Sequence, residues 1–179
     1  KAHDRATRED IEFETVFGET GGDNRLLIVY NPAKLEVLAS QELAGLDIRR
    51  SNPAPLAVHF RLRGGPEFMF VVTRFDRYRE EAREQAAEGL NRWVAQQTLP
   101  VLAVGTFGFG WSTKDDGASR EPGFDKLIAG GALTWVRPSR IVPTECGPER
   151  NVEDFILVGG PARDWPIKVR VLSDAPNYC

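Results

Sequence analysis

The sequence contains few of the residues that catalytic and metal sites use most often. Its 179 residues include two histidines, two cysteines and one methionine. Two cysteines are too few for a disulfide framework, and a structural zinc site needs four ligands. A serine–histidine–acid triad would need His3 or His59, and neither lies at the end of an expected strand. The sequence therefore predicts no self-sufficient catalytic constellation.

Long apolar runs and a strong charge of one sign are also missing. The longest apolar runs, 26–30, 68–72 and 99–104, have the length of strands and are too short to span a membrane. The net charge of -3 gives no overall basic field, which argues against a nucleic-acid partner. The chain opens KAHDRATRED, with neither a methionine nor a signal peptide. Either a signal or anchor was removed or the chain is a fragment, and the sequence leaves both open.

The two cysteines, Cys146 and Cys179, allow two interpretations. They are either free thiols or one disulfide that ties the last residue to the loop after Pro143. We favour the disulfide, because a terminal cysteine would otherwise lie on a fraying, exposed end. Such a bridge would contribute about 3 to 4 kcal/mol in the chain-entropy model. It would also indicate an oxidising compartment, so we expect an extracytoplasmic (periplasmic or secreted) location.

Alternation of apolar and polar residues predicts several strands and one long helix. The expected strands are 11–17, 25–30, 35–38, 56–62, 68–72, 101–104, 133–136, 154–158 and 167–172. We expect 25–30 and 35–38 to form a hairpin, and a glycine-rich turn, GTFGFG, to follow 101–104. The helix is expected over Arg77 to Gln97 with Asp76 as its N-cap, and a short helical turn over 124–129. The pattern predicts one α/β domain with mostly antiparallel strands.

Charged and glycine-rich segments give only weak signals of function. Four arginines lie around the start of the expected helix: Arg74, Arg77, Arg79 and Arg83. They are either a solvated helix face or a site for a phosphate or an acidic partner. GTFGFG lacks the lysine and helix start of a phosphate-binding loop, so a tight turn is the simpler interpretation. Gln41-Glu42 resembles a metal-binding glutamate at the end of a strand, but a surface turn or a helix start is the simpler interpretation.

Several phrases, in order, resemble bacterial members of the endonuclease/exonuclease/phosphatase superfamily. They are FMFVVTRFDR, REEAREQAAEGLNRWVAQQTLPVLAVGTFGFGW, PGFDKLIAGGALTWVRP, TEC and EDFILVGG. The resemblance extends from about Gly21 to Cys179. It implies a deoxyribonuclease I-like fold, a four-layer sandwich of two mostly antiparallel sheets between helices. It also implies Mg²⁺-dependent phosphoester hydrolysis as the activity of the family.

The polar residues of the family's active site are replaced in this sequence. The strand before the helix normally ends Asn-His-Leu and here reads TRF, so Arg74 stands at the histidine position. The strand after the helix normally ends Gly-Asp-Phe/Tyr-Asn and here reads GTFG, which puts Thr106 and Gly108 at the Asp and Asn positions. Gly110 occupies the place of a further Asp. A permanently charged arginine would repel Mg²⁺, and a glycine offers no ligand.

The family's two ends are also absent by this resemblance. Members begin with a strand carrying Asn and then a Gln-Glu motif whose Glu binds the metal, and they end with Ser-Asp-His. Here residues 173–175 read Ser-Asp-Ala, which matches the last motif only in its first two residues. The resemblance therefore implies one domain over 1–179 that lacks the usual first strand or strands and the terminal Ser-Asp-His strand.

These observations lead to a main expectation and an alternative. We expect a catalytically inactive nuclease- or phosphatase-like domain, without a cofactor, that acts as a binding or structural subunit of a larger protein assembly. The alternative is a Mg²⁺-dependent phosphoesterase with a rearranged site. That enzyme would recruit other acids as metal ligands: Asp76, Asp125, Asp154 or Asp174. A degraded copy with no function of its own is a third possibility.

Overall fold

The computed structural model describes residues 2–3, 10–46, 52–146, 148 and 150–171. The strands are β1 (Ala2–His3), β2 (Asp10–Ile11), β3 (Glu14–Phe17), β4 (Leu27–Tyr30), β5 (Leu35–Glu42), β6 (Leu56–Leu62), β7 (Glu67–Arg74), β8 (Val101–Ser112), β9 (Leu133–Trp135) and β10 (Asn151–Gly159). The α-helices are α1 (Glu80–Ala95) and α2 (Pro122–Ile128). Short 3₁₀ turns are η1 (Gly22–Asn24), η2 (Ala44–Leu46), η3 (Ala129–Gly131) and η4 (Gly160–Asp164).

A six-stranded sheet in the order β5-β6-β7-β8-β10-β9 forms the centre of the molecule. All neighbours in it run antiparallel except β7 and β8, which are parallel and are connected through α1. A parallel pair needs such a crossover connection, so the strand–helix–strand order in the sequence determines this arrangement. The expected mixed α/β class with mostly antiparallel strands is confirmed.

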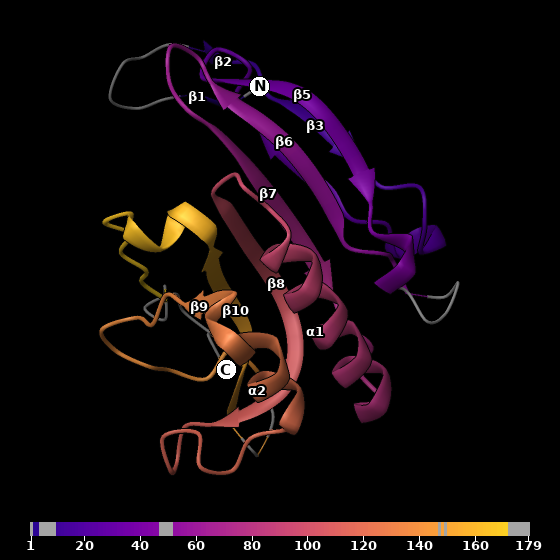
Figure 1. Cartoon of the computed structure of the whole chain (residues 1–179), viewed down its shortest axis with the longest axis vertical. Coiled ribbons are helices and arrows are strands. Elements are labelled where there is room, and N and C mark those ends of the chain that lie inside the picture. The colour runs from indigo at the N-terminus through magenta and orange to yellow at the C-terminus, as the bar shows by residue number, and fades with distance from the viewer. Residues whose placement is uncertain (1, 4–9, 47–51, 147, 149, 172–179) are drawn as a thin grey trace.

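The two helices cover one face of the sheet and lie side by side there (Figure 1). The apolar face of α1, including Ala87, Leu90 and Val94, packs on this face and is buried. Below α2 the core is aromatic, with Phe107, Phe109, Phe124 and Phe155 in mutual ring contact. Aromatic side chains bury large areas, so this cluster dominates the packing under the helices.

The opposite face of the sheet is covered in part by the β3–β4 hairpin. Alternate residues of β6 point to this face, and Leu56, Val58 and Phe60 form a second apolar core there with Ile28 of β4. Side chains of β7 on the same face, such as Phe70, are only partly buried. The two faces of the central sheet are therefore unequally covered within the described residues.

The expected glycine turn after 101–104 is wrong, because β8 continues to Ser112. Thr106 pairs with Asp154 and Trp111 with Val152, so Phe107–Gly110 of β8 face only Glu153 of β10. Gly108 and Gly110 adopt positive φ values of 67° and 56° in this bulge. Glycine accepts this backbone without a steric penalty, so the strand bends here and does not end.

Other boundaries also differ from the expectations. The segment 25–30 forms a hairpin with β3 and not with 35–38, because β5 pairs with β6. Gln41-Glu42 belongs to β5, so the expected surface turn is wrong. The N-cap of α1 is Arg79, and Asp76 instead accepts a hydrogen bond from the Tyr78 N–H at 2.8 Å. The segment 167–171 has no regular structure, in contrast to the expected last strand.

Candidate functional site at the ends of β7 and β8

The parallel pairing of β7 with β8 brings the replaced active-site positions together. Arg74, the last residue of β7, is the register partner of Thr106 in β8. Thr106 in turn faces Asp154 of β10, and its Oγ1 donates a hydrogen bond to Asp154 Oδ1 at 2.5 Å. The positions that the sequence predicts at strand ends therefore lie side by side on three neighbouring strands, at the end of β7 and within β8 and β10; we call this place the β7–β8 edge.

Arg74 is exposed on the sheet face opposite α1. Its Nη1 donates to Asn24 Oδ1 of η1 at 3.2 Å. Guanidinium stays charged at any physiological pH, so Arg74 neither accepts a proton nor binds a cation. The Arg74 side chain can therefore only donate hydrogen bonds or pair with an anion.

Gly105 shows how closely the two strands approach at this edge. Its φ is 141°, and a Cβ added there would lie 1.9 Å from the carbonyl oxygen of Thr73. Only glycine fits beside β7 at this point. The first residue of the GTFG phrase is therefore required by backbone packing, and Thr106 follows it in a fixed position.

The space next to Gly108 is filled by a buried arginine. A Cβ added at Gly108 would lie 3.2 Å from Cδ of Arg83, a residue of α1. Arg83 donates from Nε and Nη2 to the Glu121 carboxylate at 2.9 and 2.7 Å. Its Nη1 donates to the carbonyl oxygens of Asp76 and Arg77, both at 2.9 Å. The Arg83 side chain is 7% exposed, so this fork is a structural ion pair inside the fold.

Sequence reasoning missed the Arg83–Glu121 pair. It grouped Arg83 with three other arginines as a solvated helix face, and the structure corrects this. Arg83 lies on the buried side of α1 with Ala86 and Ala87. The small residues spaced around it in the sequence were the available signal that this side of the helix is buried. Arg77 contacts Glu145 at 3.6 Å and Arg74 contacts Asn24 at 3.2 Å, so these arginines have separate partners.

The acids expected to serve as alternative metal ligands are dispersed. Asp76 accepts from the Tyr78 N–H, and Asp125 pairs with Arg120 at 2.8 Å. Asp154 bonds Thr106 at the β7–β8 edge, Asp76 follows the last residue of β7 by two positions, and Asp174 lies outside the described residues. Within the described residues, no group of three or more His, Cys, Asp or Glu side chains could hold a metal ion.

Glu153 lies in the β10 segment opposite the glycine bulge and carries an altered pKa. Partial burial raises the pKa of its carboxyl above the ordinary range, and the nearby Glu145 carboxylate raises it further. The positive charge of Arg77 acts in the opposite direction. The raised pKa means that the folded protein favours the charged form of this carboxyl less than water does.

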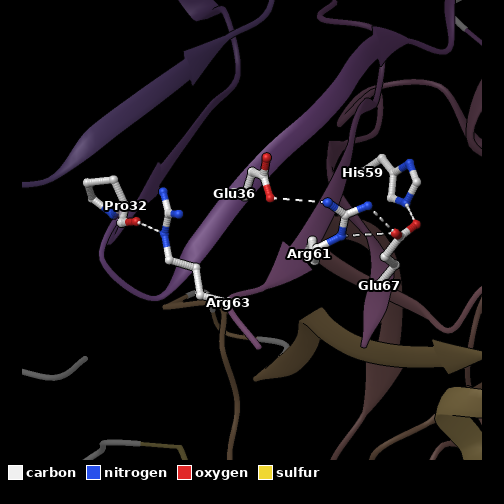
Figure 2. Close-up of polar contacts among 6 residues, drawn as sticks. All are labelled: Pro32, Glu36, His59, Arg61, Arg63 and Glu67. Atoms are coloured by element: carbon white, nitrogen blue, oxygen red, sulfur yellow. Dashed lines mark hydrogen bonds and ion pairs between the residues drawn. The ribbon is translucent and has the colours of Figure 1, made fainter. Parts of the chain in front are cut away.

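His59 is far from this edge and belongs to a different cluster. Its Nε2 lies 2.8 Å from Glu67 Oε2, and Arg61 donates from Nη2 to Glu67 Oε1 at 2.6 Å (Figure 2). Arg61 also contacts Glu36 of the neighbouring strand. Glu67 begins β7 whereas Arg74 ends it, so the length of the strand separates His59 from Thr106. His3 lies in β1.

Cys146 lies in the loop before β10, and Cys179 lies outside the described residues. The predicted disulfide therefore stays a prediction. Among the residues that the structure describes, no helix is long and apolar enough to cross a membrane.

Comparisons of the sequence with protein-family models and with curated proteins give no match. The structure is similar to an endonuclease/exonuclease/phosphatase family protein from Bacteroides thetaiotaomicron, with a TM-score of 0.59 and 17% identity over 82% of this chain and 60% of that one. It is also similar to the mannosyl-6-phosphatase Bt3783 of B. thetaiotaomicron, with a TM-score of 0.57 and 17% identity over 82% and 62% of the two chains. For D. rerio TDP2 complexed with a single-stranded DNA product, the TM-score is 0.65 and the identity 10%, over 92% and 67%.

These similarities define the fold. The chain has the deoxyribonuclease I-like fold of the endonuclease/exonuclease/phosphatase superfamily, as the sequence resemblance predicts. It spans about three fifths of the length of the two Bacteroides structures. The identities of 10–17% carry no further conclusion about activity.

Proposed function

We propose that this domain is a catalytically inactive, nuclease- or phosphatase-like module that acts as a binding or structural subunit of a larger protein assembly. The observation that carries the proposal is the Arg83–Glu121 ion pair beside Gly108. The pair is part of the folded core, so the position of the family's Asn has been converted from a functional to a structural one.

The residues around the pair support the same interpretation. Arg74 supplies a fixed positive charge where the family has a histidine, and Thr106 uses Asp154 as its hydrogen-bond acceptor. Both side chains therefore have protein hydrogen-bond partners, whereas the buried Thr73 hydroxyl beside them has none among the described residues. The role of the domain then depends on its surface, and the apolar side chains exposed on the β3–β4 hairpin favour a protein partner.

A second candidate is a Mg²⁺-dependent phosphoesterase with a rearranged site. Asp154 favours it, because this exposed carboxylate lies at the edge where β7, β8 and β10 meet. Such an enzyme would bind Mg²⁺ through Asp154 and a further acid such as Asp125. Asp125 is paired with Arg120 in the structure, so this candidate requires that ion pair to open.

Restoring the replaced positions tests the proposal. We expect the double variant Thr106→Asp, Gly108→Asn to show no Mg²⁺-dependent phosphodiester hydrolysis, because Arg83 and Arg74 remain. The single variant Gly108→Ala is the matched control for folding, because its Cβ would contact the Arg83 side chain just as the Cβ of the introduced asparagine would. Measurable turnover by the double variant would show that the edge still has a working arrangement and would contradict the proposal.

A further inference from the structure

An apolar groove with a volume of about 520 Å³ follows one side of β4. All four β4 residues line it, together with Phe13 and Asn31, and no residue of β3 does. Its floor is the partly covered face of the central sheet, formed by Phe60, Phe68, Phe70, Val72 and Leu102. The groove therefore runs along the side of β4 that faces away from β3.

The backbone of β4 is unpaired along this groove. The Gly18 N–H donates to the Leu26 carbonyl at 2.8 Å, in register with the β3–β4 ladder. Hydrogen-bonded and non-hydrogen-bonded pairs alternate in an antiparallel ladder, so the N–H and C=O of Leu27 and Val29 point away from β3. Within the described residues no strand pairs with this side of β4. Such an edge is a template for one more strand.

Exposed apolar side chains concentrate at the same place. Phe13, Phe17, Leu27 and Val29 are each between 44% and 56% exposed. In the part of the chain that the structure describes, the other exposed large apolar residues are Leu62 and Tyr78. An apolar patch beside an open strand edge is typical of a surface that another polypeptide covers.

A positive charge lies just beyond one end of the groove and gives the expected strand a direction: Val72 lines the groove, and Arg74 is the next residue on the same face of β7. Asn24, just before β4, contacts Arg74 at the end of β7. At the other end Tyr30 packs on Phe60, which packs on Phe68 near the start of β7. A strand antiparallel to β4 would therefore have its C-terminal end near Arg74. Among the described residues, Arg74 contacts an amide oxygen and has no carboxylate partner.

We propose that the groove binds an extended segment of a partner protein. The segment pairs antiparallel with β4, directs apolar side chains at alternate positions to the groove floor, and presents a carboxylate to Arg74 at its C-terminal end. The four residues of β4, with the further step from Leu27 to Arg74, fit a segment of about six residues. This inference rests on the proposed function, because it states the chemistry of the partner that the binding subunit takes.

Defined peptides provide the test. The probe is a labelled hexapeptide with alternating threonine and valine residues, made with either a C-terminal carboxylate or a C-terminal amide. Fluorescence anisotropy should show the carboxylate form binding about tenfold more tightly than the amide form. In the variant Arg74→Ala this ratio should fall to about one.

Two further measurements separate main-chain pairing from simple apolar adsorption. Val29→Pro should weaken binding at least about tenfold, and it leaves the β3–β4 hydrogen bonds intact because the Val29 N–H is not part of them. Leu62→Asp, which removes an exposed apolar residue outside the groove, should leave binding unchanged. Methylating alternate peptide nitrogens should abolish binding to the unaltered protein, which excludes a folding defect as the cause.

Several results would overturn the proposal. They are an equal affinity of the acid and amide peptides, undiminished binding to Val29→Pro, and no binding by the wild-type protein. If the protein is a dimer that Val29→Pro dissociates, the occupant is a second copy. If binding appears only after removal of residues 172–179, the occupant is the chain's own end. Metal-dependent hydrolysis would instead contradict the proposed function, and the peptide results would remain interpretable.

Discussion

At the scale of single residues, ion pairs and hydrogen bonds within the protein occupy the β7–β8 edge, where we propose that the catalytic groups of the fold are replaced. Arg83 donates to one carboxylate and two backbone carbonyls from a nearly fully buried position. Thr106 and Asp154 form a hydrogen bond across β8 and β10. Groups with such partners stabilise the fold, and a catalytic or ligand-binding role would require these bonds to break.

The Arg83–Glu121 pair should contribute strongly to stability. We expect Arg83→Ala to lower the free energy of unfolding by about 3 kcal/mol or more, because it leaves Glu121 without its partner and opens space beside Gly108. Arg92→Ala on the same helix is the control: its side chain is 70% exposed and it contacts Glu88 at 3.7 Å. This control should cost less than about 1 kcal/mol. Urea unfolding measures both, and equal losses would contradict the structural role of Arg83.

Glu153 and Glu67 should give opposite dependences of stability on pH. The pKa of Glu153 is raised by burial, so its folded-state advantage exists at low pH and is lost as the pH rises through the folded pKa. The pKa of Glu67 is lowered by the hydrogen bond from Arg61, so its contribution is present near neutral pH and is lost as the pH falls.

Urea unfolding near pH 7 and near pH 4 tests both pH dependences of stability, because the two pH values lie on either side of an ordinary carboxyl pKa. Glu153→Gln should raise the unfolding midpoint at about pH 7, and Glu67→Gln should lower it. The Glu153 difference should shrink at about pH 4, and the Glu67 difference should shrink only as the pH falls further. A stabilising Glu67→Gln, or a Glu153→Gln variant that is destabilised at neutral pH, would show that the assigned causes are wrong.

At the scale of elements, hydrophobic periodicity predicted the regular segments well. The alternation over 56–62 and the apolar face of 77–97 correspond to β6 and α1, although α1 is shorter at both ends. The continuation of β8 through its glycines could not be predicted, because glycine favours turns locally. Pairing with both β7 and β10 overrides that local preference.

The continuity of α1 is testable by proline substitution. Ala86→Pro should destabilise the protein by about 3 kcal/mol or more, since it removes a helical hydrogen bond at a position buried in the core. Glu80→Pro, at the first helical residue, should be tolerated much better, because the N–H there has no intrahelical partner. Similar thermal midpoints for the two variants would contradict a single continuous helix.

At the scale of the whole molecule, the two faces of the central sheet have different roles. The face under α1 and α2 is a closed, largely aromatic core, whereas the opposite face is only partly covered by the β3–β4 hairpin. The sequence located the edge of the site through its resemblance to the superfamily, which placed Arg74 and Thr106 at strand ends. It did not reveal Arg83 or the groove along β4, because both depend on contacts between segments distant in the chain.

The central claim is that the β7–β8 edge is no longer a metal-dependent catalytic site. The most direct test is thermal unfolding of the protein with and without millimolar Mg²⁺ and Mn²⁺, combined with a phosphodiester hydrolysis assay. A ligand that binds only the native state must raise the thermal unfolding midpoint of the protein. We expect an unchanged thermal unfolding midpoint and no phosphodiester hydrolysis. A metal-dependent rise together with hydrolysis, lost in Asp154→Asn, would contradict it and establish a rearranged active site.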